Sequence, residues 1–207
     1  MLKIFLHGLG QKPESWTETL ELLGSAGYSL CPDLSELLQG KEPTYQNLYE
    51  AVSMICNQSN EVIDLCGLSL GGVLALNYAI AYPQKVHSLV LLAPQYKMPK
   101  NLLKLQNFLF RFMPSSAFQS TGFEKKAFIR LCKTMMELDF SNLLSKITCP
   151  TLVLYGERDQ ANRKAAVKLA GILKNAELRE IAGAGHEINR DAPEKLSEIL
   201  CDFYNRS

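Results

Sequence analysis

One serine lies between glycines where a strand-like pattern changes to a helix-like pattern, in IDLCGLSLGGVLAL (63–76). The preceding residues, NEVIDLC, are apolar and partly β-branched, and the following residues, GGVLALNYAIAYP, are apolar at helical spacing up to a proline. With Gly67 and Gly71 on either side, Ser69 matches G-x-S-x-G, which predicts a tight turn that lifts the hydroxyl out of a sheet. The alternative is a serine that only caps the helix, but a cap does not require glycine on both sides.

Strand-like and helical patterns alternate along most of the chain. The predicted strands are residues 3–8, 28–34, 61–66, 85–94, 149–159 and 177–183. The predicted helices are residues 15–27, 44–58, the segment after Ser69, 161–176 and 192–205. Several strands are mostly Val, Leu and Ile, as expected of a parallel sheet covered on both faces. We predict a single α/β domain (1–207) with a doubly wound, mostly parallel six-stranded sheet.

Residues 95–147 interrupt this alternation with two helical patterns and no strand between them. The apolar residues of each pattern fall on one face: Leu105, Phe108, Leu109 and Phe112 in the first, and Phe128, Leu131, Cys132 and Met135 in the second. Because long insertions in compact domains are usually functional, we predict a small helical lid with apolar inner faces. The alternative is a pair of ordinary core helices.

Charge and cysteine content argue against several classes of protein. The 22 basic and 21 acidic residues give a net charge of +1 without long like-charged blocks, so no nucleic-acid partner is expected. The N-terminal residues lack a signal-peptide pattern, and no apolar run approaches about 18 residues, so we expect a cytoplasmic protein without a membrane partner. The six cysteines form no C-x-x-C pair, and no disulfide framework, metal site or cofactor is indicated.

A serine nucleophile needs a base, and the chain has three histidines. His186 occupies AGAGHEINRDAP, a glycine-rich loop directly after the last predicted strand, where a half-exposed imidazole is expected. His87 falls within a strand pattern and is predicted to be structural. His7, in HGLG, is predicted to brace a loop. His186 is therefore the predicted base.

The acid that orients the base has two candidates in YGERD, at the end of the predicted strand 149–159. Asp159 lies farther beyond the strand than Glu157 and fits the chain order Ser, Asp, His. We predict Asp159, with Glu157 as the competitor. Either residue could instead be a solvated loop carboxylate.

Four motifs in this order, HGLG (7–10), GLSLGG (67–72), YGERD (155–159) and GAGH (183–186), resemble those of the α/β-hydrolases. The resemblance implies an oxyanion hole formed by the backbone N–H groups of Leu9 and Leu70. It also implies a missing pair of first strands, since the HG strand begins at residue 3, and hence an all-parallel sheet. The segment PDLSELLQGKEPTY (32–45) lacks the glycine turn that the family usually has at this point. Asp33 in this segment is therefore expected to brace the site and not to take part in catalysis.

The resemblance implies a serine hydrolase that cleaves a small carboxylic ester or thioester through Ser69, His186 and Asp159, without cofactor or metal. One alternative is an enzyme that uses the same three residues for a different reaction, either hydrolysis of a carbon–carbon bond or a lyase reaction like that of the menaquinone pathway. Another is a non-catalytic binding module, since fold does not imply function.

The charge of the inserted segment bears on the substrate. Residues 97–139 hold eight basic and three acidic side chains, a net charge of +5, which leaves −4 for the rest. A positive lid favours a small-molecule acyl substrate that is anionic, although a solvated helix face is an equal alternative. Monomer and homodimer both stay open, because a partner's edge could replace the strands beside residues 28–31.

Overall fold

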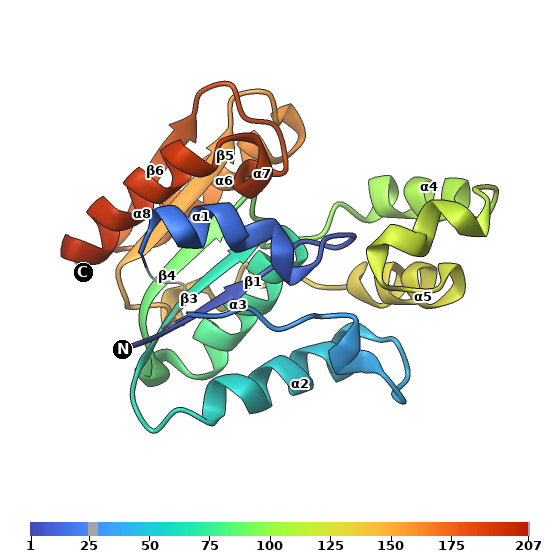
Figure 1. Cartoon of the computed structure of the whole chain (residues 1–207), viewed down its shortest axis with the longest axis horizontal. Coiled ribbons are helices and arrows are strands. Elements are labelled where there is room, and N and C mark those ends of the chain that lie inside the picture. The colour runs from blue at the N-terminus through green and yellow to red at the C-terminus, as the bar shows by residue number, and fades with distance from the viewer. Residues whose placement is uncertain (25–28, 207) are drawn as a thin grey trace.

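The computed structural model describes residues 1–24 and 29–206, and its centre is a six-stranded sheet (Figure 1). The strands are β1 (Leu2–Leu6), β2 (Ser29–Leu30), β3 (Ile63–Leu68), β4 (Val86–Leu92), β5 (Thr151–Gly156) and β6 (Ala176–Ile181). Their spatial order is β2-β1-β3-β4-β5-β6, and every neighbouring pair is parallel. The predicted doubly wound α/β sheet is confirmed.

Strand β2 is shorter than the strand predicted over residues 28–34. Only Ser29 and Leu30 pair with β1. Pro32 has no N–H to continue the pairing, and the Asp33 carboxylate accepts a hydrogen bond from the Ser35 N–H at 2.8 Å, which closes a turn. Residue 28 lies outside the described residues.

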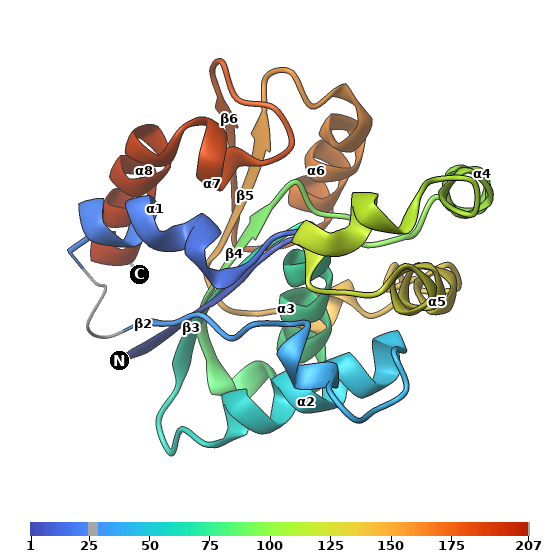
Figure 2. The same ribbon diagram turned by 45° about the vertical axis from the view of Figure 1, so that its right-hand side comes forward.

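Helices cover both faces of the sheet (Figure 2). One face carries α1 (Thr17–Leu22), α7 (Ile188–Asp191) and α8 (Pro193–Arg206), and the other carries α2 (Tyr45–Asn57), α3 (Leu70–Ala81) and α6 (Gln160–Ile172). The helix predicted over residues 15–27 consists of a 3-10 turn (Pro13–Trp16) and α1, and its last predicted residues, 25–27, lie outside the described part. None of the helices described here has the length and apolar character needed to cross a membrane.

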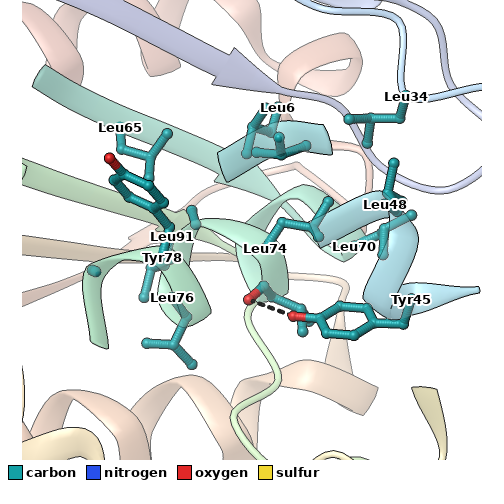
Figure 3. Close-up of a cluster of buried hydrophobic side chains, with 14 of the residues drawn as sticks. Leu6, Leu34, Tyr45, Leu48, Leu65, Leu70, Leu74, Leu76, Tyr78 and Leu91 are labelled. Atoms are coloured by element: carbon teal, nitrogen blue, oxygen red, sulfur yellow. Dashed lines mark hydrogen bonds between the residues drawn. The ribbon is translucent and has the colours of Figure 1, made fainter. Parts of the chain in front are cut away.

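The packing of α3 determines where Ser69 lies. Leu70 and Leu74 of α3 lie beside Leu48 and Tyr45 of α2 in the core (Figure 3), and all four are buried. Burial of one leucine side chain contributes about 1.5–3 kcal/mol. This packing holds the first turn of α3 at the carboxyl end of β3, and Ser69 directly precedes that turn.

The insertion (residues 95–147) joins β4 to β5. It contains α4 (Lys100–Phe110), a 3-10 segment (Ser115–Thr121) and α5 (Lys125–Met135). Helices α4 and α5 contact each other and project away from the sheet (Figures 1 and 2). The apolar face predicted for the second helix is buried: Phe128, Leu131, Cys132 and Met135.

The apolar face predicted for the first helix does not point inward, and that expectation was wrong. Its members lie exposed: Leu105, Phe108, Leu109 and Phe112. Helix α4 instead turns Asn107, Leu103 and Phe110 inward, and the Phe110 ring packs 5.9 Å from Phe118 and 5.4 Å from Phe128. Because α4 has apolar residues on two sides, its neighbours in the insertion can cover only one of them.

Candidate active site

Ser69 occupies the sharp turn between β3 and α3. Its φ of 52° and ψ of −111° are rare for a residue with a side chain, and its side chain makes no capping hydrogen bond to the helix. Its N–H donates to the Leu92 carbonyl at 2.9 Å, and its carbonyl accepts from the Val73 N–H at 2.9 Å. The turn is therefore held by backbone bonds, and the interpretation of Ser69 as a helix cap does not apply.

Two glycines allow this turn to form. A Cβ on Gly67 would lie 2.3 Å from the Gly71 carbonyl oxygen, and a Cβ on Gly71 would lie 2.1 Å from the Leu6 carbonyl oxygen. Both obstacles are backbone atoms, which a side-chain movement cannot relieve. The glycines predicted on either side of the serine are thus required by the close approach of β1, β3 and α3.

We expect Gly71→Ala to destabilise the fold by about 3 kcal/mol or more, because the added methyl group overlaps the backbone of β1. The matched control is Gly171→Ala in α6, where a Cβ meets nothing within 4 Å. That change should be neutral or stabilise by about 0.5 kcal/mol. Urea unfolding of both variants measures the difference, and equal stabilities would contradict the close approach.

Asp159 and His186 form a hydrogen-bonded pair from neighbouring loops. The Nδ1 of His186 lies 2.8 Å from the Asp159 Oδ2. Asp159 follows β5 and is the N-cap of α6, and His186 follows β6. Because an ionised carboxylate only accepts hydrogen bonds, Nδ1 carries the proton, and Nε2 is left as the basic nitrogen.

Asn162 holds the carboxylate of this pair. Its side-chain nitrogen donates to both Asp159 oxygens, at 2.9 and 2.8 Å, and lies 3.1 Å from the His186 Nδ1. Gln95 in turn donates to the Asn162 oxygen at 2.7 Å. Burial raises the pKa of Asp159, but the hydrogen bonds from His186 and Asn162 outweigh it and hold this pKa below its ordinary value. The carboxylate is therefore ionised at neutral pH.

Glu157, the competing acid, has a different position. Its carboxylate accepts a hydrogen bond from the Gly183 N–H at 2.7 Å and does not line the cavity around His186. It braces the loop between β6 and His186. Within the described part of the chain, Asp159 is therefore the only one of the two acids in YGERD that contacts His186.

The other two histidines lie where the sequence predicts them. His7 is buried: its Nδ1 donates to the Gly8 carbonyl at 2.9 Å, and its Nε2 accepts from the Leu34 N–H at 3.0 Å. Burial lowers the pKa of His7, consistent with a neutral ring that ties two loops together. His87 lies 3.0 Å from the buried Asp64 and does not line the cavity.

A cavity of about 740 Å³ brings the candidate residues together at the carboxyl ends of the strands. Ser69, Asp159 and His186 line it, as do Leu9 and Leu70. Its apolar wall includes Val73, Met98, Leu103, Phe128, Cys132 and Met135. Every residue that the sequence predicts for the site therefore faces one space.

Other residues that line this cavity belong to none of the motifs in the sequence. Asn162 carried one available signal: it lies three residues after Asp159 and donates its N–H to that N-cap carboxylate at 3.3 Å. Lys164 and Lys168 also line the cavity. Asp33 braces a nearby loop through Lys12 and Ser35.

No cluster of three or more His, Cys, Asp or Glu side chains within residues 1–24 and 29–206 is arranged to hold a metal ion. All six cysteines are free thiols.

Comparisons with known proteins show the family of this chain. The sequence pattern of the alpha/beta hydrolase family matches residues 4–199. The chain is 22% identical to monoacylglycerol lipase ABHD6 of Homo sapiens over 97% of this chain and 74% of that protein. It is 23% identical to 2-hydroxy-6-oxononadienedioate/2-hydroxy-6-oxononatrienedioate hydrolase 2 of Pseudomonas putida over 97% of this chain and 86% of that protein.

Solved structures share the fold. MenH from S. aureus has a TM-score of 0.84 at 17% identity, covering 100% of this chain and 94% of that chain. A thermophilic esterase from Thermogutta terrifontis has a TM-score of 0.81 at 19% identity, covering 100% of this chain and 90% of that chain. Because the family pattern spans nearly the whole sequence and the sheet agrees with it, this chain belongs to the α/β hydrolase family of enzymes.

Proposed function

We propose that this enzyme hydrolyses a small carboxylic ester or thioester through Ser69, His186 and Asp159. The Ser69 Oγ attacks the carbonyl carbon while the His186 Nε2 takes its proton. The tetrahedral intermediate expels the alcohol or thiol, which receives that proton, and leaves an acyl group on Ser69. Water, activated by His186, then attacks the acyl group and releases the acid. Asp159 keeps the imidazole oriented and stabilises its charged form.

The observation that carries this proposal is the 2.8 Å Asp159–His186 contact in the cavity that Ser69 also lines. A histidine held in the Nδ1–H tautomer by a carboxylate is the base that a serine hydroxyl needs. The positive φ of Ser69 supports the same role, because strained backbone is concentrated at functional sites.

Backbone N–H groups of Leu9 and Leu70 are proposed to form the oxyanion hole. Leu70 is the first residue of α3, a 12-residue helix whose N-terminus favours negative charge. The Leu9 N–H has no hydrogen-bond partner among the described residues. One such donor contributes about 3 kcal/mol to the stability of a developing oxyanion.

The insertion is proposed to act as a lid within a single domain, 1–207. Helices α4 and α5 contribute Leu103, Phe128, Cys132 and Met135 to the apolar wall of the cavity, which suits an acyl group. The predicted location in the cytoplasm stays a prediction.

Fluorophosphonate labelling tests the nucleophile directly. The Ser69 oxygen would displace fluoride from phosphorus, and intact-mass spectrometry would show one adduct that peptide mapping places on Ser69. A panel of acyl esters and thioesters then defines the leaving group. Absence of labelling together with absence of turnover would favour a non-catalytic binding module.

Hydrolysis of a carbon–carbon bond in an anionic substrate is the second candidate. It is favoured by the lysines of the cavity and by the Pseudomonas putida relative, whose name specifies a dioate, which is a dicarboxylate. A lyase reaction with the same triad is its variant. Turnover of a vinylogous diketone acid in the absence of ester turnover would select this candidate.

The structure supports an anionic substrate through other residues than the cations of the insertion, from which the sequence analysis derived it. Three cations of the insertion form salt bridges: Lys97 with Asp139, Lys100 with Glu137 and Arg130 with Glu42. Lys164 and Lys168 of α6 line the cavity, are exposed and make no salt bridge within the described residues. They lie about 8 and 14 Å beyond Asp159 along the helix axis. We therefore assign recognition of the anionic group to Lys164 and Lys168 of α6 rather than to the cations of the lid.

The double variant Lys164→Gln/Lys168→Gln should lower kcat/KM for a carboxylate-bearing ester about tenfold, because two partly solvated ion pairs are lost. A neutral ester of equal acyl length should be unaffected. The matched control, Lys146→Gln/Lys174→Gln, changes the net charge equally at exposed positions that do not line the cavity. Equal losses for both esters would contradict the assignment, as would salt-independent rates for the anionic ester.

A further inference from the structure

A row of large apolar side chains is exposed along α4 and the turn that follows it. The exposed fractions are 57% for Leu105, 54% for Phe108, 54% for Leu109 and 74% for Phe112. The spacing of i, i+3, i+4 and i+7 places these four residues on one side of a helix, over a length of about 10 Å. We call them the α4 stripe. The rings of Phe108 and Phe112 lie 5.1 Å apart, so they form one continuous patch.

The α4 stripe is not the side of the helix that the fold uses. The opposite side carries Leu103 and Phe110, which pack against the core, and the buried Asn107. A surface helix normally has one apolar side and one polar side. Helix α4 therefore has a second apolar side that the rest of the described chain does not cover, and such patches mark interaction sites.

Basic side chains follow one edge of the α4 stripe. Lys100, Lys104 and Arg111 are spaced four and seven residues apart, which places them in one row beside the stripe. Lys100 pairs with Glu137, whereas Lys104 and Arg111 make no salt bridge within the described residues. The surrounding segment, residues 97–139, carries a net charge of +5, against −4 for the rest of the chain.

We propose that the α4 stripe docks on a lipid surface that carries anionic headgroups. An apolar side bordered by lysine and arginine is the arrangement with which a helix lies in the membrane interface. A second copy of this chain fits less well, because a two-fold contact between two stripes brings two rows of cations together. Anionic lipid complements both the apolar residues and the charge.

Docking would also bring the cavity close to the lipid. Leu103 and Gln106 of α4 line the cavity, so the same helix has one side at the proposed surface and another at the cavity that Ser69 and His186 also line. The proposal goes beyond ester hydrolysis, which requires no surface, and departs from the expectation that the protein has no membrane partner. That expectation rested on the absence of a long apolar run, and the sequence analysis placed the α4 stripe on the inner face of the lid, whereas its residues are exposed.

Co-sedimentation with vesicles tests the proposal in the Ser69→Ala background, which prevents hydrolysis of the lipid. We expect at least tenfold tighter binding to phosphatidylcholine vesicles containing 30% phosphatidylglycerol than to phosphatidylcholine alone, at low salt. Phe108→Gln/Phe112→Gln should weaken binding at least tenfold. Lys104→Gln/Arg111→Gln should remove most of the preference for phosphatidylglycerol. The matched control is Met54→Gln, an exposed apolar residue of α2 that should bind normally.

Circular dichroism confirms that each variant folds, so a loss of binding is assigned to the surface. Unchanged binding of Phe108→Gln/Phe112→Gln would overturn the proposal, as would absence of binding to either vesicle. A dimer of the Ser69→Ala protein in light scattering that this double variant converts to a monomer would instead assign the stripe to a second copy. None of these readouts depends on turnover, so the proposal fails or holds independently of the proposed hydrolysis.

Discussion

Ser69→Ala is expected to lower turnover of the best ester about 10⁶-fold, because it removes the atom that forms the acyl-enzyme. His186→Ala should cost a similar factor, since the serine hydroxyl then has no base. The two losses should not multiply in the double variant, because the residues act on the same step. Steady-state and single-turnover assays with a chromogenic ester measure each loss.

The controls separate chemistry from folding. Neither Ser69→Ala nor His186→Ala should change the urea midpoint by much, because both side chains face the cavity. His7→Ala should lower the midpoint, since the His7 ring bonds two loops from a buried position. Full activity of Ser69→Ala would rule out the assignment of the nucleophile.

Asp159→Asn is expected to lower kcat about 10⁴-fold at neutral pH. The amide removes the charge that stabilises the imidazolium and permits the wrong imidazole tautomer. Glu157→Gln should have a mild effect, because the Glu157 carboxylate binds the Gly183 N–H and not His186. The pH profile of kcat, measured for both variants, shows whether the acidic limb, on which a general base becomes protonated, moves with Asp159.

The reverse ranking of these two variants would transfer the orienting role to Glu157. Asn162→Ala provides a further check, because Asn162 donates to both Asp159 oxygens. Its loss should reduce kcat less than Asp159→Asn and should leave KM for a neutral ester nearly unchanged. A lower kcat with an unchanged KM is expected of a residue that positions the acid and does not contact the reacting atoms.

Local patterns in the sequence predict much of this enzyme. The parallel sheet follows from apolar strands alternating with helices, and the turn at Ser69 follows from its glycines, because both depend on residues that are close in the chain. The boundaries of β2 were less predictable. A proline and a turn at Asp33 end that strand after two residues, although its apolar pattern extends further.

The sequence by itself determined the order of the strands and helices, the turn at Ser69 and the loop that carries His186, since these are encoded in neighbouring residues. The tertiary structure alone decided that Asp159 and not Glu157 meets His186 and that Asn162 joins this pair. It also decided that Lys164 and Lys168 face the cavity and that the α4 stripe points outward. Each of these outcomes depends on how separate segments pack. A helix with two apolar sides illustrates the reason: its pattern cannot show which side its neighbours will cover, because that choice is made only when the chain is folded.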